Sequence, residues 1–175
     1  RGIWILDDLT PLRALTPALL QEEAAFLPTR PQQQRIRAGG GWPEGDASYT
    51  GENAPGSVTI TYYQKARHLF GKLKIEVLDD KGKIVDTLPA SKRRGINRVA
   101  WSMNVAPPRV PPAAQVAGSA TRGPRVVPGT YTVRMTKGTR TYETKVTVGL
   151  DPRSPFTPAE RREQFDAAMT VHAMF

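Results

Sequence analysis

The sequence contains no cysteine, and several features common in enzymes and membrane proteins are also missing. Without cysteine, these residues cannot form a disulfide, use a thiol nucleophile or bind zinc through thiolates. No apolar run approaches the roughly 18 residues of a membrane-spanning helix, so we expect none in this chain. Hydrophobic residues make up 39%, below the globular average of about 45–50%, whereas Pro (16) and Gly (15) are frequent. We therefore expect a packed core of roughly 100 residues with extended arms.

Motifs for catalysis and cofactor binding are missing as well. Glycosidases need two carboxylates held apart around a cleft, but the carboxylate pairs here are adjacent, at Asp7-Asp8 and Asp79-Asp80. Asp79-Asp80 precedes Lys81-Gly82 and predicts a turn, whereas Asp7-Asp8 is expected to end a strand or contact the linker. His68 and His172 have no acidic cluster nearby, and we expect His68 at the surface. No G-x-S-x-G elbow, P-loop or G-x-G-x-x-G is present, so we predict no catalytic residue, no cofactor and no metal ligand.

The positive charge is confined to the middle of the chain. The net charge is +9, with 17 Lys/Arg against 5 Asp/Glu in residues 56–150 and a small negative balance in each flank. Such a segment attracts acidic proteins, anionic lipid headgroups, polyanionic glycans or nucleic acid, although a merely solvated face has the same composition.

A period-two alternation of apolar and polar residues runs through the same segment. The turn at residues 79–82 and the sequence Lys137-Gly138-Thr139 separate such runs, and Trp101 is expected in the core. Short alternating strands without helices between them predict an antiparallel β-sandwich. The predicted strands are 58–63, 72–78, 83–88, 96–102, 131–136 and 142–148, with a further short one near 126–127.

The two ends of the chain have different patterns. Residues 3–6 form an apolar run that predicts a buried strand, and Thr16-Pro17 is expected to begin a short amphipathic helix that ends at Pro28. Residues 28–56 lack periodicity and predict an extended arm. Thr157-Pro158 is typical of a helix start, and that helix would present Phe165, Ala168, Met169 and His172 on one face.

Several segments together resemble the C-terminal region of sortilin-like, BNR-repeat β-propeller proteins of bacteria, often labelled "glycosyl hydrolase". These are RGIWILDDLTPLR (1–13), KLKIEVLDDKGKIVDTL (72–88), GINRVAWSMN (95–104), VVPGTYTVRMT (126–136) and TYETKVTVGLDPR (141–153). The resemblance implies an immunoglobulin-like domain, similar to that of flagellar hook-capping proteins, after the last propeller strand. Any catalytic surface of the propeller would lie outside these residues.

The expected fold is mainly β: an antiparallel immunoglobulin-like sandwich with an extended N-terminal arm and a C-terminal helix. We divide the chain into a strand left from a propeller-like blade (1–13), a helical turn and Pro/Gly-rich arm (14–56), the sandwich (57–150) and the C-terminal helix (151–175). A proline-rich insertion is expected within the sandwich at about 106–128.

The candidate partner-binding residues are of two kinds. Trp42 lies between Gly and Pro without a core of its own, so it and Trp4 are candidate anchors in a neighbouring protein. The basic candidates are Arg35, Arg37, Lys65, Arg67, Lys72, Lys74, Lys92, Arg93 and Arg94. Nucleic acid is disfavoured, because few aromatics are interleaved with these cations.

These features predict a non-catalytic structural subunit, periplasmic or extracellular, that docks peripherally on a membrane-associated complex of other proteins and contacts anionic headgroups. Two alternatives stay open. One is a carbohydrate-binding or accessory domain of a secreted BNR-propeller glycosidase, and the other is a fragment of an enzyme whose catalytic propeller is absent.

Overall fold

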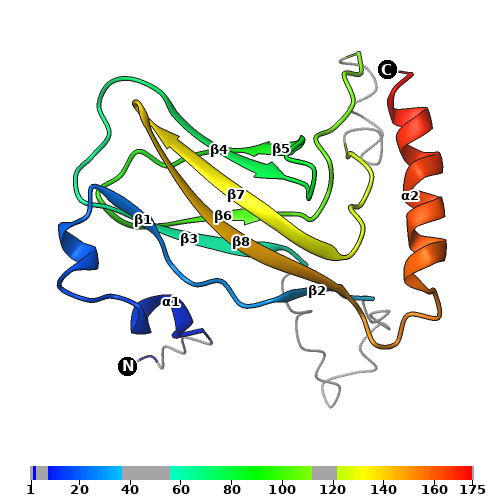
Figure 1. The fold of residues 1–175 in the computed structure, drawn as a ribbon, viewed down its shortest axis with the longest axis horizontal. Coiled ribbons are helices and arrows are strands. Elements are labelled where there is room, and N and C mark those ends of the chain that lie inside the picture. Colours follow the sequence, from blue (N-terminus) through cyan, green and yellow to red (C-terminus); the bar gives the residue numbers. More distant parts are fainter. Residues whose placement is uncertain (1, 3–7, 37–55, 112–121, 175) are drawn as a thin grey trace.

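Alternating residues give each strand one apolar face, and two sheets pack such faces against each other (Figure 1). This is seen in a computed structural model that describes residue 2 and residues 8–36, 56–111 and 122–174. The elements are α1 (Thr10–Arg13), a 3-10 turn η1 (Leu19–Gln21), β1 (Ala24–Phe26), β2 (Gln32–Gln34), β3 (Val58–Gln64), β4 (Leu73–Leu78), β5 (Ile84–Leu88), β6 (Gly95–Trp101), β7 (Gly129–Lys137), β8 (Arg140–Leu150) and α2 (Pro158–His172).

The strand order confirms the predicted sandwich. One sheet has the order β1-β3-β6 and the other has the order β2-β8-β7-β4-β5. With β2 set aside, this arrangement corresponds to strands A-B-E facing G-F-C-C′ of an immunoglobulin-like domain. One pairing departs from the expected antiparallel pattern, because β2 runs parallel to β8, with Gln32 opposite Val148. The N-terminal segment thus contributes one strand to each sheet.

The core lies between the sheets around Trp101 and Tyr131, and the prediction for Trp101 is confirmed. Trp101 is fully buried, and its ring meets the ring of Tyr131 edge to face with centroids 5.0 Å apart. The Tyr131 hydroxyl donates a hydrogen bond to the Val127 carbonyl at 2.7 Å. A tyrosine that bonds backward at the start of this strand is a recurrent corner of immunoglobulin-like sandwiches. Burial raises the pKa of Tyr131 to about 12, so the phenol keeps its proton.

The N-terminal segment differs most from the sequence-based expectation. The helix predicted from Thr16-Pro17 to Pro28 is wrong beyond its first turn, where Thr16 Oγ1 accepts from the backbone N–H of Leu19. Residues Ala24–Phe26 instead pair with β3, and Gln32–Gln34, in the predicted arm, pair with β8. The backbone groups of these two segments find their hydrogen-bond partners at sheet edges. A local sequence pattern does not encode such distant partners. The predicted strand at residues 3–6 lies outside the described residues.

The C-terminal helix begins as predicted. Thr157 Oγ1 accepts from the backbone N–H of Glu160, and the Glu160 carboxylate accepts from the backbone N–H of Thr157. Helix α2 stands beside one end of the sandwich (Figure 1), and none of its residues is buried. The His172 ring is 2.9 Å from the Ala106 carbonyl oxygen, which links the last turn of the helix to the segment after β6.

Two smaller expectations differ in part from the structure. Period-two alternation with Ile75 and Val77 predicts that Glu76 faces outward beside Lys74, and it does, since the two are ion-paired. It is nevertheless buried, because Arg134 and Thr87 lie opposite it on the flanking strands. The short strand near residues 126–127 is reduced to a single bridge between Asn104 and Arg125.

Candidate functional site

Three segments meet at the end of the sandwich opposite α2, and together they form a basic surface. The β3–β4 loop (65–72), the β5–β6 loop (89–94) and the β7–β8 turn (138–139) lie at this end (Figure 1). The backbone N–H of Gly138 donates to the Lys72 carbonyl at 2.7 Å, and that of His68 donates to the Lys92 carbonyl at 2.9 Å. We call this surface the basic end; its exposed cations are Lys65, Arg67, Lys72, Lys92, Arg93, Arg94 and Arg140.

Buried side chains of β3 and β6 hold the β5–β6 loop in place. Tyr62 Oη donates to the Ser91 carbonyl at 3.1 Å and accepts from the Ser91 N–H at 2.7 Å. Gln64 Nε2 donates to the carbonyls of Ser91 (2.8 Å) and Arg93 (3.1 Å). Asn97 Nδ2 adds a bond to the Arg93 carbonyl at 2.9 Å. The backbone that carries Lys92, Arg93 and Arg94 is therefore fixed by polar groups of the core, and the charged side chains extend from it into solvent.

His68 is a buried side chain that holds the β3–β4 loop in place. The prediction that it lies at the surface is wrong. The residue is 8% exposed. Its Nε2 is 3.1 Å from the Gly71 carbonyl oxygen, which can only accept, so the ring nitrogen is the donor. The ring thus closes the loop from inside. Gly71 has a φ of +87°, a conformation that glycine adopts without strain. The two residues between them, Leu69 and Phe70, are directed outward, with 61% and 88% of their surface exposed.

The exposed cations of the basic end exceed the acidic charge beside them, although Glu23 lies near enough to Lys65 and Arg140 for both to lower its pKa. Within the described part of the chain, none of its seven cations forms an ion pair. The sequence has no Asp or Glu between residues 86 and 143, which spans the β5–β6 loop and the β7–β8 turn. The neighbouring Lys137 is neutralised, because its buried Nζ is 2.6 Å from Glu23 Oε1, and this bond lowers the pKa of Glu23.

The structure brings together six of the predicted partner-binding residues and separates others from them. Lys74 follows on β4, where it is ion-paired with Glu76. Arg35 lies beyond β2, at the far end of the sandwich, because Gln34 is opposite Leu150 whereas Arg140 begins β8. At roughly 3.3 Å per residue, the 11 residues of β8 separate the two by about 35 Å. Trp4, Trp42 and Arg37 lie outside the described residues.

Sequence reasoning missed three members of this end: Leu69, Phe70 and Arg140. Arg140 could have been found, because it follows the predicted turn at residues 137–139 and pairs with Lys137. Leu69-Phe70 carried no usable signal, since two apolar residues between strands are equally typical of a buried corner.

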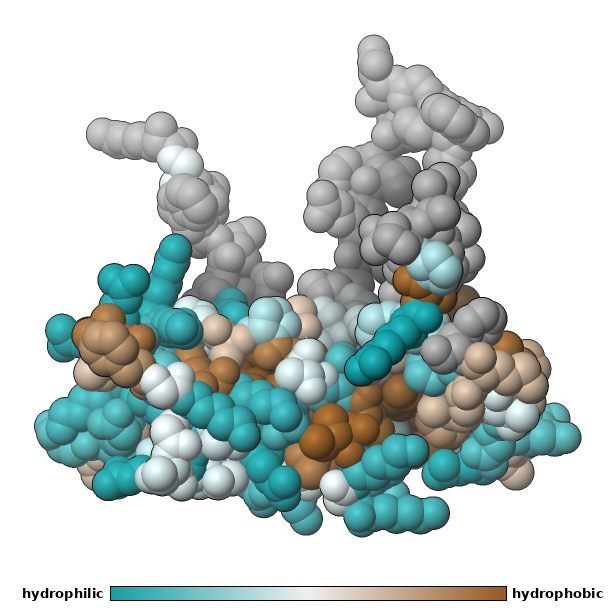
Figure 2. Space-filling view, turned by 90° about the horizontal axis from the view of Figure 1, so that it is seen from above, coloured by the Kyte–Doolittle hydropathy of each residue, from teal (hydrophilic) through white to brown (hydrophobic). Residues whose placement is uncertain are grey.

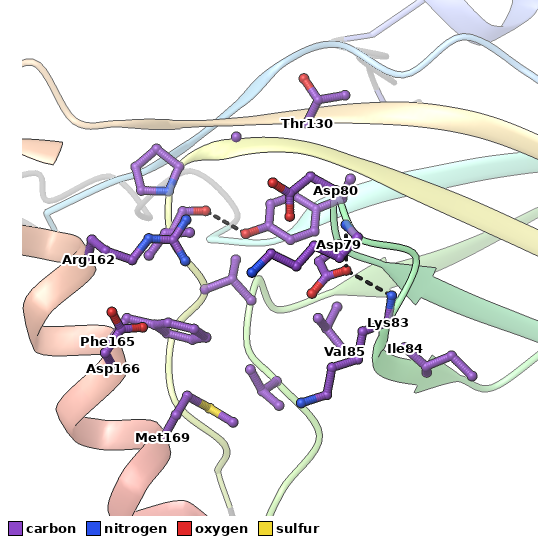
Figure 3. A pocket seen from close by; sticks show the side chains of 17 residues that line it. Asp79, Asp80, Lys83, Ile84, Val85, Thr130, Arg162, Phe165, Asp166 and Met169 are labelled. Atoms are coloured by element: carbon purple, nitrogen blue, oxygen red, sulfur yellow. Dashed lines mark hydrogen bonds between the residues drawn. The ribbon is translucent and has the colours of Figure 1, made fainter. Parts of the chain in front are cut away.

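A second candidate is a cavity of about 590 Å³ at the opposite end, between α2 and the β4–β5 turn. Phe165, Met169 and Arg162 line it from the helix, facing Val85 and the Asp79-Asp80 turn (Figure 3). Asp79 Oδ1 accepts from the N–H groups of Lys81 (3.0 Å) and Lys83 (2.8 Å). The turn predicted at Asp79-Asp80 is confirmed, and its first carboxylate is occupied by backbone donors.

Two further carboxylates, those of Asp151 and Asp8, serve as structural ties. Asp151 accepts two bonds from the Arg153 guanidinium, at 3.0 and 2.6 Å, and one from the Ile36 N–H at 2.8 Å. These bonds hold the pKa of Asp151 well below its usual range. Asp8 Oδ1 accepts from the backbone N–H of Thr10 and is 3.1 Å from Arg30 Nε, so the expected contact between this carboxylate and the linker is present. Among residues 8–36, 56–111 and 122–174 there is no cluster of three His, Asp or Glu that could hold a metal ion.

In comparisons with known proteins, no family model and no curated protein matches this sequence.

Proposed function

We propose that this chain is a non-catalytic structural subunit that docks peripherally, through its basic end, on a larger envelope-associated membrane-protein complex and stabilises it. The observation that carries the proposal is the gathering of seven exposed cations from three separate segments at one end. None of them has an ion-pair partner among the described residues. Such a surface accelerates encounter with an acidic partner and fixes its orientation.

The buried anchors of the loops support docking rather than simple solvation. A solvated charged face needs no buried support, whereas here Tyr62, Gln64 and His68 commit core polar groups to the loop backbones. A preordered surface loses less conformational entropy when it binds. The proposed subunit is periplasmic or extracellular and peripheral. No helix in the described ranges is long and apolar enough to cross a membrane.

A carbohydrate-binding accessory domain is supported less well. Sugar platforms use neighbouring exposed aromatic rings, and the strongly exposed aromatics of the described residues are Phe70 and Phe156. Phe70 belongs to the basic end, whereas Phe156 precedes α2 at the other end, so the two rings do not form a platform of neighbouring aromatics.

The proposal is tested by purifying the chain from its source in mild detergent, identifying its companions and eluting them with salt. We expect a membrane complex that retains the subunit at low salt and releases it at high salt, since salt screens exposed charges. The variant Arg93→Gln/Arg94→Gln is expected to be released at lower salt. The matched control Lys81→Gln/Lys83→Gln removes two exposed charges at the far end and should behave like the wild type. A chain found without stable companions would contradict the proposal.

A further inference from the structure

The most exposed apolar residues of the basic end are neighbours in the β3–β4 loop, and we call this pair, Leu69 and Phe70, the apolar tip. Phe70 is 88% exposed and Leu69 is 61% exposed, although either side chain would be strongly stabilised by burial. Single exposed apolar residues are ordinary, but these two are adjacent and the buried His68 beneath them fixes the loop. The folded loop therefore holds both apolar side chains in solvent.

Exposed cations lie on the same loop and on the two segments that are hydrogen-bonded to it. Lys65, Arg67 and Lys72 flank the apolar tip in this loop, and Lys92, Arg93 and Arg94 lie on the adjacent β5–β6 loop, bonded to it through His68. Arg140 follows the third segment. Figure 2 shows hydrophobic groups at this end of the molecule with hydrophilic groups around them. An exposed apolar pair with cations on its own loop and on two adjoining segments matches the order of a bilayer surface, where acyl chains lie beneath phosphate groups.

From this geometry we infer that the basic end is a membrane-docking site, at which Leu69 and Phe70 enter the interface of an anionic bilayer and the neighbouring cations contact lipid phosphates. The inference rests on the proposed function and deepens it. The end that docks on the membrane complex also contacts the lipid around that complex. The exposed pair Leu69 and Phe70 favours lipid over nucleic acid, because a bilayer has an apolar layer beneath its phosphates that these side chains can enter, whereas a phosphate backbone has none.

The expected contributions follow from general values. Each cation close to an anionic surface strengthens binding about fivefold, and partial burial of a phenylalanine ring contributes about tenfold. Anionic lipid should therefore be required for binding, and salt should weaken it. Loss of the phenylalanine ring should weaken binding without changing the number of charges.

The test is co-sedimentation of the purified full chain with phosphatidylcholine vesicles that contain or lack phosphatidylglycerol. We expect binding only with phosphatidylglycerol, about tenfold weaker binding for Phe70→Ala and about 25-fold weaker binding for Arg93→Gln/Arg94→Gln. Phe156→Ala and Lys81→Gln/Lys83→Gln are matched controls at the far end and should bind like the wild type. Because the Phe70 side chain is exposed, Phe70→Ala should keep the thermal midpoint of the wild type.

A second readout reports insertion directly. In Phe70→Trp, the new indole should shift to shorter emission wavelengths on vesicle binding and be quenched by lipids brominated in the acyl chains. Absence of vesicle binding, or binding that Phe70→Ala leaves unchanged, would overturn the inference. So would binding to single-stranded DNA or to an acidic peptide that matches vesicle binding and depends equally on Phe70.

The outcomes separate the two proposals. A chain that co-purifies with a complex but ignores vesicles would retain the structural-subunit function and refute the lipid site. A chain that binds vesicles but has no companions would support the lipid site and refute the structural-subunit function.

Discussion

The phenol of Tyr62 joins the core to the basic end, and its removal tests whether buried groups position that surface. Its hydroxyl makes two bonds to Ser91, donating to the carbonyl at 3.1 Å and accepting from the N–H at 2.7 Å. Burial raises the pKa of Tyr62, so the hydroxyl proton stays available for donation at neutral pH. Tyr62→Phe deletes both bonds and leaves the buried ring in place.

The expected loss of stability depends on which hydrogen bonds Ser91 keeps in the variant. Its carbonyl still accepts from Gln64 Nε2 at 2.8 Å, whereas its N–H loses its acceptor. With about 0.5–1.5 kcal/mol for each net hydrogen bond, Tyr62→Phe should lower the free energy of unfolding by about 1–2 kcal/mol. For a domain of this size, the thermal midpoint should fall by about 2–8 °C.

Urea unfolding followed by circular dichroism measures the global effect, and hydrogen exchange at residues 91–94 measures the loop. The control is Tyr63→Phe, which removes one exposed bond to the Leu20 carbonyl and should cost at most about 0.5 kcal/mol. If both variants unfold at the same urea concentration and exchange at residues 91–94 is unchanged, Tyr62 does not hold the loop.

Two further predictions concern the core and the tie between the N-terminal segment and the sandwich. Trp101→Ala should lower the free energy of unfolding by about 3–5 kcal/mol, because the ring is fully buried against Tyr131; urea unfolding of Ser102→Ala, an exposed neighbour, should show almost no change. Asp151 has a folded-state pKa below its unfolded value, so it stabilises the fold above about pH 4 and this contribution fades as pH falls through the folded pKa. The urea midpoints of wild type and Asp151→Asn should therefore converge on acidification, and a constant gap between them would contradict this assignment.

The alternation of side chains was sufficient to locate β3 to β8. In β7, for example, Tyr131, Val133 and Met135 are buried while the residues between them remain partly exposed, as the period-two pattern predicts. The signal is reliable because a strand between a core and solvent sorts its side chains locally. The cap of α2 was equally readable, since the Thr157 and Glu160 contacts involve only neighbouring residues.

The N-terminal strands were not predictable in this way. Gln32-Gln33-Gln34 is a polar triplet with no alternation, yet it forms β2 because the edge of β8 offers unpaired backbone groups. His68 shows the same limit for a single side chain, since its burial depends on the Lys92 and Gly71 carbonyls in the folded loops. Both outcomes come from partners that are distant in the sequence or reached only after the chain turns.

The sequence by itself determined that the chain builds a β-sandwich, ends in a capped helix and concentrates positive charge in residues 56–150, because these properties depend on local pattern and composition. Only the tertiary structure decided which charges meet. It gathered Arg67, Lys72, Arg93 and Arg140 at one end, left Arg35 at the other and exposed Phe70 among the first group. The physical reason is strand pairing, since the register and direction of each strand fix which loops share an end of the sheet.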